Sequence, residues 1–261
     1  MGIDWVVTGL TALVVFFATT IHGIAGFGTG QITMGILPFF REPGPASVIV
    51  SMLVLVTNIR VLWSVRDSFN WKDWLIPVIG LVVGLPIGVY LFGTLDQEGL
   101  RVAIGIVMLI GTILILLTRQ VTVINDWIRS TGWQPGPISG VIAGFLSGIT
   151  GGAVSIPGPP MILYGAFLVE TEYWEPKQMK AIFTAFFATN LLYRLGILMF
   201  TGDVTGELAL EALIVAPALF LGTWLGIKLF DRLPKTAFRW FLIIFLFVLS
   251  LLLIFGSPGG G

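Results

Sequence analysis

Residues 240–255 read Trp-Phe-Leu-Ile-Ile-Phe-Leu-Phe-Val-Leu-Ser-Leu-Leu-Leu-Ile-Phe, an apolar run without a charge. A transmembrane β-strand would alternate apolar and polar residues, so this run predicts a helix. Similar runs recur along the 261 residues, of which 56% are hydrophobic and 11% charged. A soluble domain usually carries about 25% charged residues. The composition therefore predicts an all-α polytopic membrane protein and excludes a soluble enzyme.

Ten apolar segments follow one another along the chain. They cover residues 5–22, 31–40, 45–65, 73–95, 99–118, 137–149, 154–169, 177–200, 208–230 and 236–255. A spanning helix needs about 20 apolar residues, so about eight to ten spans are expected. Segments 31–40 and 137–149 are too short to cross a bilayer comfortably, and each adjoins a glycine-rich stretch. We therefore expect broken or re-entrant helices at these two places.

Charged residues predict the orientation of the spans, because cytoplasmic loops are enriched in Lys and Arg. The basic positions are Arg66, Lys72, Arg119, Arg129, Lys177, Lys180, Lys228, Arg232, Lys235 and Arg239. The acidic loops contain Asp96, Glu98, Asp203 and Glu207. These charges agree with one another when each half of the chain has five segments, which places both termini outside.

The two halves of the sequence carry similar motifs in the same order. Thr57-Asn58 corresponds to Thr189-Asn190, Gly84-x-x-x-Gly88 to Gly222-x-x-x-Gly226, and Arg101 to Arg239. We therefore predict a first repeat over residues 1–120, a cytoplasmic linker over 121–136, a second, inverted repeat over 137–256 and a flexible tail over 257–261. Inverted repeats are typical of secondary transporters. The alternative is an ordinary helical bundle.

Glycine-rich breaks stand at the opening of each half, as His22-Gly-Ile-Ala-Gly-Phe-Gly-Thr-Gly30 and Ser147-Gly-Ile-Thr-Gly-Gly152. We expect segments 31–40 and 154–169 to begin at these breaks and to meet near the midplane. Their N-termini would offer N–H groups and a positive dipole end to a small anion. The alternative is that glycine only permits close helix packing. We expect that packing role for Gly80, Gly84, Gly88, Gly140, Gly144, Gly222 and Gly226.

The candidate substrate-binding residues lie at the two breaks or deep in neighbouring segments. They are His22, Gly26, Phe27, Gly28, Gly30, Gln31, Asn58, Thr150, Gly151, Gly152, Ser155, Asn190 and Arg194. Asn190 and Arg194 are four residues apart and share a helix face, so we prefer Arg194 to Arg60 as a substrate contact. For either arginine the alternative is snorkelling to the headgroups. No Asp or Glu falls at mid-membrane, so a carboxylate proton relay is not predicted.

The stretches Gly23-Ile-Ala-Gly-Phe-Gly-Thr-Gly30, leading to Pro38, and Gly144-Phe-Leu-Ser-Gly-Ile-Thr-Gly-Gly152, leading to Pro157, resemble those of the TauE/SafE sulfite exporter family. The resemblance extends over the whole chain. It implies a multi-pass transporter of the cell inner (plasma) membrane that exports sulfite or an organosulfonate such as sulfoacetate. The glycine-rich loops of the family fall on Gly26 to Gln31 and on Thr150 to Ser155.

This chain departs from the usual family pattern in ways that leave the substrate open. Thr29 and Gln31 interrupt the first glycine run, Ala153 and Val154 end the second run early, and His22 is unexpected. His22 could bind the anion, carry a coupled proton or serve a structural hydrogen bond. Asn58 and Asn190 could bind a ligand or bridge helices.

Several functions fit these residues. The first is a secondary transporter working by alternating access. The others are a small-anion channel, a transporter of a small carboxylate or other non-sulfur anion, an intramembrane hydrolase using Ser147 and His22, and a non-transporting assembly subunit.

The composition also bounds the partners and cofactors. The chain has no cysteine, one histidine and a net charge of +0, so we expect no metal, no cofactor and no nucleic acid. The expected partners are a small anion and the lipid bilayer, with coupled protons and homo-oligomer formation left open.

Overall fold

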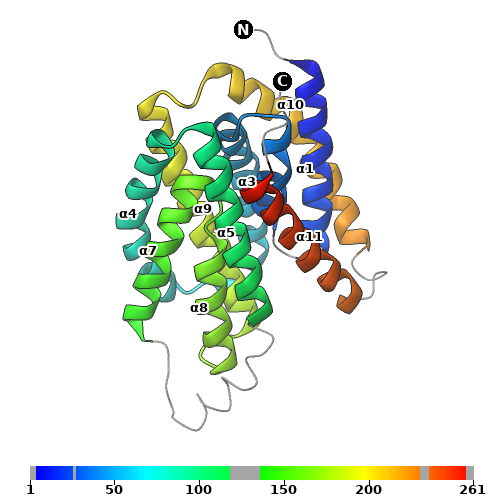
Figure 1. The fold of residues 1–261 in the computed structure, drawn as a ribbon. Helices are drawn as coiled ribbons and strands as arrows, with labels where there is room; N and C mark the ends of the chain where they lie inside the picture. The colour runs from blue at the N-terminus through cyan, green and yellow to red at the C-terminus, as the bar shows by residue number, and fades with distance from the viewer. Residues whose placement is uncertain (1–3, 26–27, 118–135, 230–234, 257–261) are drawn as a thin grey trace. The chain divides into compact units, whose positions relative to one another are not determined.

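The computed structural model describes residues 4–25, 28–117, 136–229 and 235–256, and these are helical without a strand (Figure 1). The long helices are α1 (Trp5–Ala25), α3 (Pro43–Val65), α4 (Trp71–Thr94), α5 (Gln97–Leu117), α7 (Pro137–Val154), α9 (Pro176–Thr201), α10 (Gly206–Leu229) and α11 (Lys235–Phe255). The short ones are α2 (Thr29–Ile36), α8 (Gly158–Glu170) and two 3₁₀ turns, η1 (Leu37–Phe39) and η2 (Arg66–Ser68). Within the described residues, 7 helices are long and apolar enough to cross a membrane. The predicted all-α membrane class is confirmed at this level.

The first break lies where it was expected. Helix α1 continues to Ala25, and α2 begins at Thr29 after Gly28, whose φ of 101° is a left-handed conformation that favours glycine. Helix α2 has 8 residues and continues into η1. The expectation of a short helix after the first glycine-rich stretch is therefore confirmed.

The second break differs from the prediction. Helix α7 does not end near residue 149 but continues through Gly151 and Gly152 to Val154, which gives it 18 residues and enough length to span a bilayer. The chain reverses at Ser155, whose φ is 61°, and the 13-residue α8 begins at Gly158. The short segment of this half is thus α8. The glycines do not end α7, because α4 packs directly against them.

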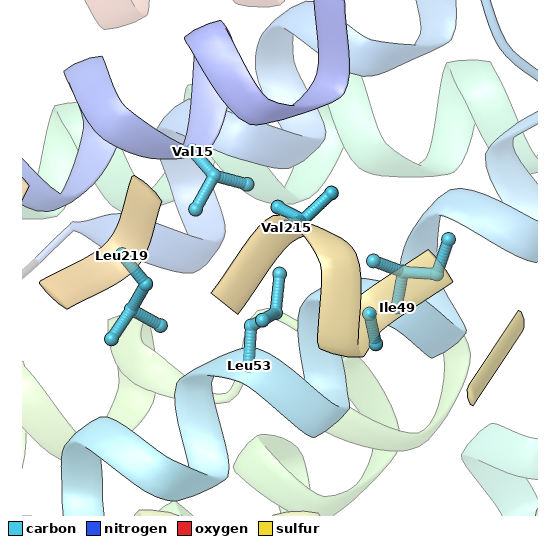
Figure 2. Close-up of a cluster of buried hydrophobic side chains, with 6 residues drawn as sticks. Val15, Ile49, Leu53, Val215 and Leu219 are labelled. Atoms are coloured by element: carbon cyan, nitrogen blue, oxygen red, sulfur yellow. The ribbon is translucent and has the colours of Figure 1, made fainter. Parts of the chain in front are cut away.

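The chain forms two compact units, and α3, α5 and α9 each contribute to both. Unit 1 comprises residues 1–54, 95–109 and 198–261. In it α1 packs along α10, and Gly222 faces the carbonyl oxygen of Phe16 and the hydroxyl of Thr19. Its apolar core combines α1, α3 and α10. Figure 2 labels the core residues Val15, Ile49, Leu53, Val215 and Leu219.

Unit 2 comprises residues 55–94 and 110–197 and is organised by the packing of α4 on α7. A Cβ atom at Gly84 would lie 2.1 Å from the carbonyl oxygen of Phe145, and one at Gly144 would lie 1.8 Å from that of Pro77. Only glycine allows two helix backbones to approach so closely. Gly80 and Gly88 meet the α7 backbone in the same way.

The predicted packing role of glycine is therefore confirmed for most of the named positions. Gly80, Gly84, Gly88, Gly144 and Gly222 all face a neighbouring helix at backbone distance. Gly140 instead faces the side chains of Ile76 and Tyr164. The role of Gly226 stays a prediction.

The helices of the two halves follow the same order. Each half begins with a long helix, continues with a short one and then adds three long ones. The first helix of each half packs on the fourth helix of the other half, α1 on α10 and α7 on α4. The predicted linker over 121–136 lies almost wholly outside the described residues, as does the tail over 257–261.

Candidate functional site

In unit 2, Gly151 and Gly152 of α7 contact Asn190 and Arg194 of α9. Together with Ser147, one turn before Gly151 on α7, we call these residues the α7–α9 polar cluster. Asn190 and Arg194 lie one turn apart on α9, and both are completely buried. The Nε atom of Arg194 donates a hydrogen bond to the carbonyl oxygen of Gly152 at 2.9 Å. The amide of Asn190 lies against Gly151, where a Cβ atom would be 2.4 Å from Nδ2. Asn190 and Arg194 thus share a helix face, as predicted, and that face contacts the second glycine-rich stretch.

Glycine at the end of α7 explains why α9 can approach here. The last four carbonyl groups of a helix have no partner within that helix, and the carbonyl of Gly152 is one of these. The negative end of the helix dipole also favours a cation at this place. A side chain at residue 151 would collide with Asn190. Glycine at this position therefore allows both Asn190 and Arg194 to reach the end of α7.

The origin of the positive field at this site differs from the prediction. Thr150, Gly151 and Gly152 belong to the last turns of α7, so they present carbonyl groups rather than a helix N-terminus. The Thr150 hydroxyl donates to the carbonyl of Leu146 within α7, at 3.2 Å. The positive charge of the cluster comes from Arg194 instead.

Arg194 is buried in protein, and snorkelling is therefore wrong for this side chain. An arginine at the centre of a membrane helix costs about 2.5–3.5 kcal/mol on insertion scales. The guanidinium carbon lies 5.1 Å from the centre of the Phe92 ring. The Arg60 side chain lies outside the described residues.

Three polar atoms of the cluster have no hydrogen-bond partner among the described residues. They are Oγ of Ser147 and both Oδ1 and Nδ2 of Asn190. Leaving a buried polar group unsatisfied costs about 1–3 kcal/mol. Each such group therefore needs an explanation. An amide offers both donors and an acceptor, so the cluster combines a cation with unused hydrogen-bonding groups.

The predicted residues of the first break lie in unit 1. Gln31 is buried on α2, and its Oε1 has no partner among the described residues; the same holds for Oγ1 of Thr29, which sequence analysis did not select for binding. Gly28 and Gly30 open α2, and His22 lies in the last turn of α1. Gly26 and Phe27 lie outside the described residues.

Asn58 and Ser155 belong to unit 2 and are buried. The backbone N–H of Ser155 donates to the carbonyl of Gly151 at 3.1 Å, so Ser155 ends α7. Between Asn58 and the cluster, the described part of the chain has no hydrogen bond. Ser147 and His22, the pair considered for a hydrolase, belong to different units.

Two buried carboxylates were not selected from the sequence. In unit 1, Glu211 of α10 forms an ion pair with both terminal nitrogens of Arg41, with Nη2 to Oε2 at 2.6 Å, and accepts a hydrogen bond from Thr8. In unit 2, Oδ2 of Asp73 accepts a hydrogen bond from Nε2 of Gln178 at 2.8 Å. One sequence feature relates the two acids: they are 138 residues apart, the same offset as between Gly84 and Gly222.

These observations define a multi-pass membrane protein with a buried, cationic polar cluster. A family model described as sulfite exporter TauE/SafE matches residues 11–253, and the chain therefore belongs to this family. The predicted resemblance is confirmed, and with it the assignment to a family of membrane transporters. Comparisons with curated proteins and with solved structures gave no match.

Proposed function

We propose that this protein is a secondary transporter that exports a small sulfur oxyanion, sulfite or an organosulfonate such as sulfoacetate, by alternating access. The observation that carries the proposal is the α7–α9 polar cluster, in which the buried Arg194 guanidinium neighbours an amide without a partner. Family membership supports the transport of an anion.

The chemistry of the cluster suits a compact oxyanion. A guanidinium group is planar and always charged, and it forms strong hydrogen bonds to oxyanions. The Asn190 amide would donate to a second oxygen, and the Ser147 hydroxyl could donate to a third. One cation balances a sulfonate or a bisulfite, whereas a trianion would leave charge uncompensated in a buried site.

The order of the helices supports alternating access. The long–short–long–long–long order in each half and the exchanged packing of first and fourth helices are what inverted repeats would produce. In this proposal α2, with Gln31 and Thr29, is the counterpart in the first half of the short α8. Movement of one half against the other would then expose the bound anion to each side in turn.

A binding experiment tests the proposal. The melting temperature of the purified protein is recorded with sulfite, thiosulfate, sulfate, sulfoacetate, isethionate, taurine, acetate and malonate, at matched ionic strength and pH. A ligand at 100 times its Kd stabilises by about 2.7 kcal/mol. We expect selective stabilisation by sulfite or a sulfonate, and stabilisation by acetate or malonate alone would favour the carboxylate alternative.

Two variants make this test specific to the cluster. Asn190→Leu removes a buried amide that has no partner, so the folded protein should lose little stability while anion binding is lost. Thr184→Val is the matched control on the same helix, since its hydroxyl bonds within α9. Equal stabilisation of wild type and Asn190→Leu by the anion would refute the cluster as the site. Radiolabelled flux and single-channel recording in the same lipids then separate a carrier from a channel.

A further inference from the structure

Two buried acids occupy matching places in the two halves of the chain. Asp73 lies in the first turn of α4, and Glu211 lies in the second turn of α10. Each of these helices is the fourth α-helix of its half. Both residues are 8% exposed. Their 138-residue offset equals that of the glycines through which the same helices pack.

The partners of the two acids differ in charge. Glu211 pairs with Arg41, whose guanidinium cannot be deprotonated in a protein, so the partner of this acid is a permanent cation. Arg41 follows the short α2 and η1. In the other half, Trp174 follows the short α8, and its buried indole lies near Asp73 without forming a hydrogen bond of normal geometry.

Asp73 has neutral neighbours where Glu211 has a cation. Its hydrogen bond comes from Gln178, and an amide can donate to a carboxylate or, after rotating, accept from a carboxylic acid. Both protonation states of Asp73 therefore have a partner at the same place. The partner of Glu211 is instead the fixed positive charge of Arg41.

The charged surroundings of Asp73 are sparse. Tyr164 of α8 is the titratable group that faces it, and α7 has no ionisable side chain between residues 137 and 154. Nearby charged residues of α4, the α8–α9 connection and α9 are exposed: Lys72, Glu172, Glu175, Lys177 and Lys180. Within the described residues, Asp73 makes no ion pair.

We propose that Asp73 takes up and releases the proton that accompanies the transported anion; this inference rests on the proposed function. Gln178 lies at the start of α9, the helix that carries Asn190 and Arg194. Residues 178 and 190 are separated by about 18 Å of helix at 1.5 Å per residue. A change in the Asp73–Gln178 hydrogen bond therefore acts on the helix that holds the anion cluster.

The test uses full-length protein in proteoliposomes, with radiolabelled sulfite outside and a pH-sensitive dye inside. Because sulfite itself binds protons near neutral pH, every variant is compared with wild type at the same pH. We expect sulfite uptake by wild type to change with an imposed pH gradient and to be accompanied by a proton signal. In Asp73→Asn the proton signal per sulfite taken up should fall to the signal that the protonation of sulfite itself produces, while sulfite still raises the melting temperature.

Asp67→Asn is the control for loss of an acid near the same end of α4, because its side chain is 84% exposed. It should behave as wild type. Gln178→Leu keeps the carboxyl but removes its partner, and should shift the pH at which uptake is half-maximal. If Asp73→Asn does not fold, this second variant decides, and an unchanged pH profile overturns the inference.

The outcomes separate this inference from the proposed function. Sulfite transport by wild type without a proton signal, or an undiminished signal in Asp73→Asn, overturns the role of Asp73 and leaves the transporter in place. Absence of both sulfite uptake and stabilisation by every anion of the panel would reject the proposed function, and the inference with it.

Discussion

Gly151→Ala should weaken anion binding without unfolding the protein. The new methyl group would lie 2.4 Å from Nδ2 and 2.7 Å from Oδ1 of Asn190, which is well inside van der Waals contact. The atoms that must move are the end of a side chain, and an off-rotamer side chain costs about 0.5–1.5 kcal/mol. Alanine is preferred to glycine in a helix by about 1 kcal/mol. The two effects nearly cancel in the stability of the ligand-free protein.

The same displacement is costly for the ligand. A hydrogen bond to a charged group contributes about 1.5–3 kcal/mol, so moving the amide away should weaken the Kd roughly 10- to 150-fold. At an anion concentration of 100 times the wild-type Kd, the stabilisation of about 2.7 kcal/mol would fall to about 0.3–1.4 kcal/mol. Thermal unfolding with and without the stabilising anion measures both numbers.

Gly152→Ala is the contrasting variant in the next position. Its methyl group would lie 2.6 Å from the carbonyl oxygen of Leu85 and 2.8 Å from the backbone nitrogen of Val89. Backbone atoms of α4 cannot rotate away, so overpacking should destabilise the ligand-free protein by about 1–3 kcal/mol. The reasoning is refuted if Gly151→Ala keeps the full anion response, or if the two variants lose the same stability before anion is added.

Two further predictions concern stability and are checked by thermal unfolding in detergent. Gly84→Ala should destabilise the protein by about 1–3 kcal/mol, because its methyl group would meet the Phe145 carbonyl. Gly93→Ala on the same helix has open space around it and should be neutral or slightly stabilising. Similar losses of stability in both variants would contradict the packing role of Gly84. Arg41→Met should lower the free energy of unfolding by about 3 kcal/mol, because it leaves Glu211 buried without its cation. Adding Glu211→Gln to the same chain should restore much of that loss. If it restores none, Arg41 stabilises the protein through something other than this pair.

Much of the helical layout could be predicted from composition and hydropathy. The apolar segments 45–65, 73–95 and 177–200 correspond to α3, α4 and α9 with ends shifted by one or two residues. The reason is physical, since lipid-exposed backbone must be hydrogen-bonded within its own helix. Apolar length is therefore a strong signal in this class of protein.

The extent of α7 could not be predicted in the same way. Glycine weakens a helix in isolation, so Ser147-Gly-Ile-Thr-Gly-Gly152 indicated a break. In the structure Gly148 and Gly152 lie on the face where α4 packs at backbone distance, and the helix continues to Val154. Sequence alone does not reveal which helix packs there.

Part of the candidate site could be predicted from the sequence. The four-residue spacing of Asn190 and Arg194 correctly placed them on one helix face, and the approach of that face to Gly151 and Gly152 is a tertiary fact. Asp73 and Glu211 are related by the same 138-residue offset as the repeated glycines, so the repeat pattern relates them as well. The sequence does not reveal their burial, because both acids lie near helix ends and are covered only by the packing of other helices.

If the two halves are repeats, as we propose, their differences carry more functional information than their similarities. At the 132-residue offset that aligns Asn58 with Asn190, Arg194 corresponds to Leu62, so the amide is present in both halves and the cation in one. The cation that follows the short helix of the first half, Arg41, is paired with Glu211. A symmetric distribution of charge would give two equal sites. The observed distribution instead places a buried cation, Arg194, in the α7–α9 polar cluster. It also places an acid with a neutral partner, Asp73, at the start of the same helix α9, where Gln178 donates to it.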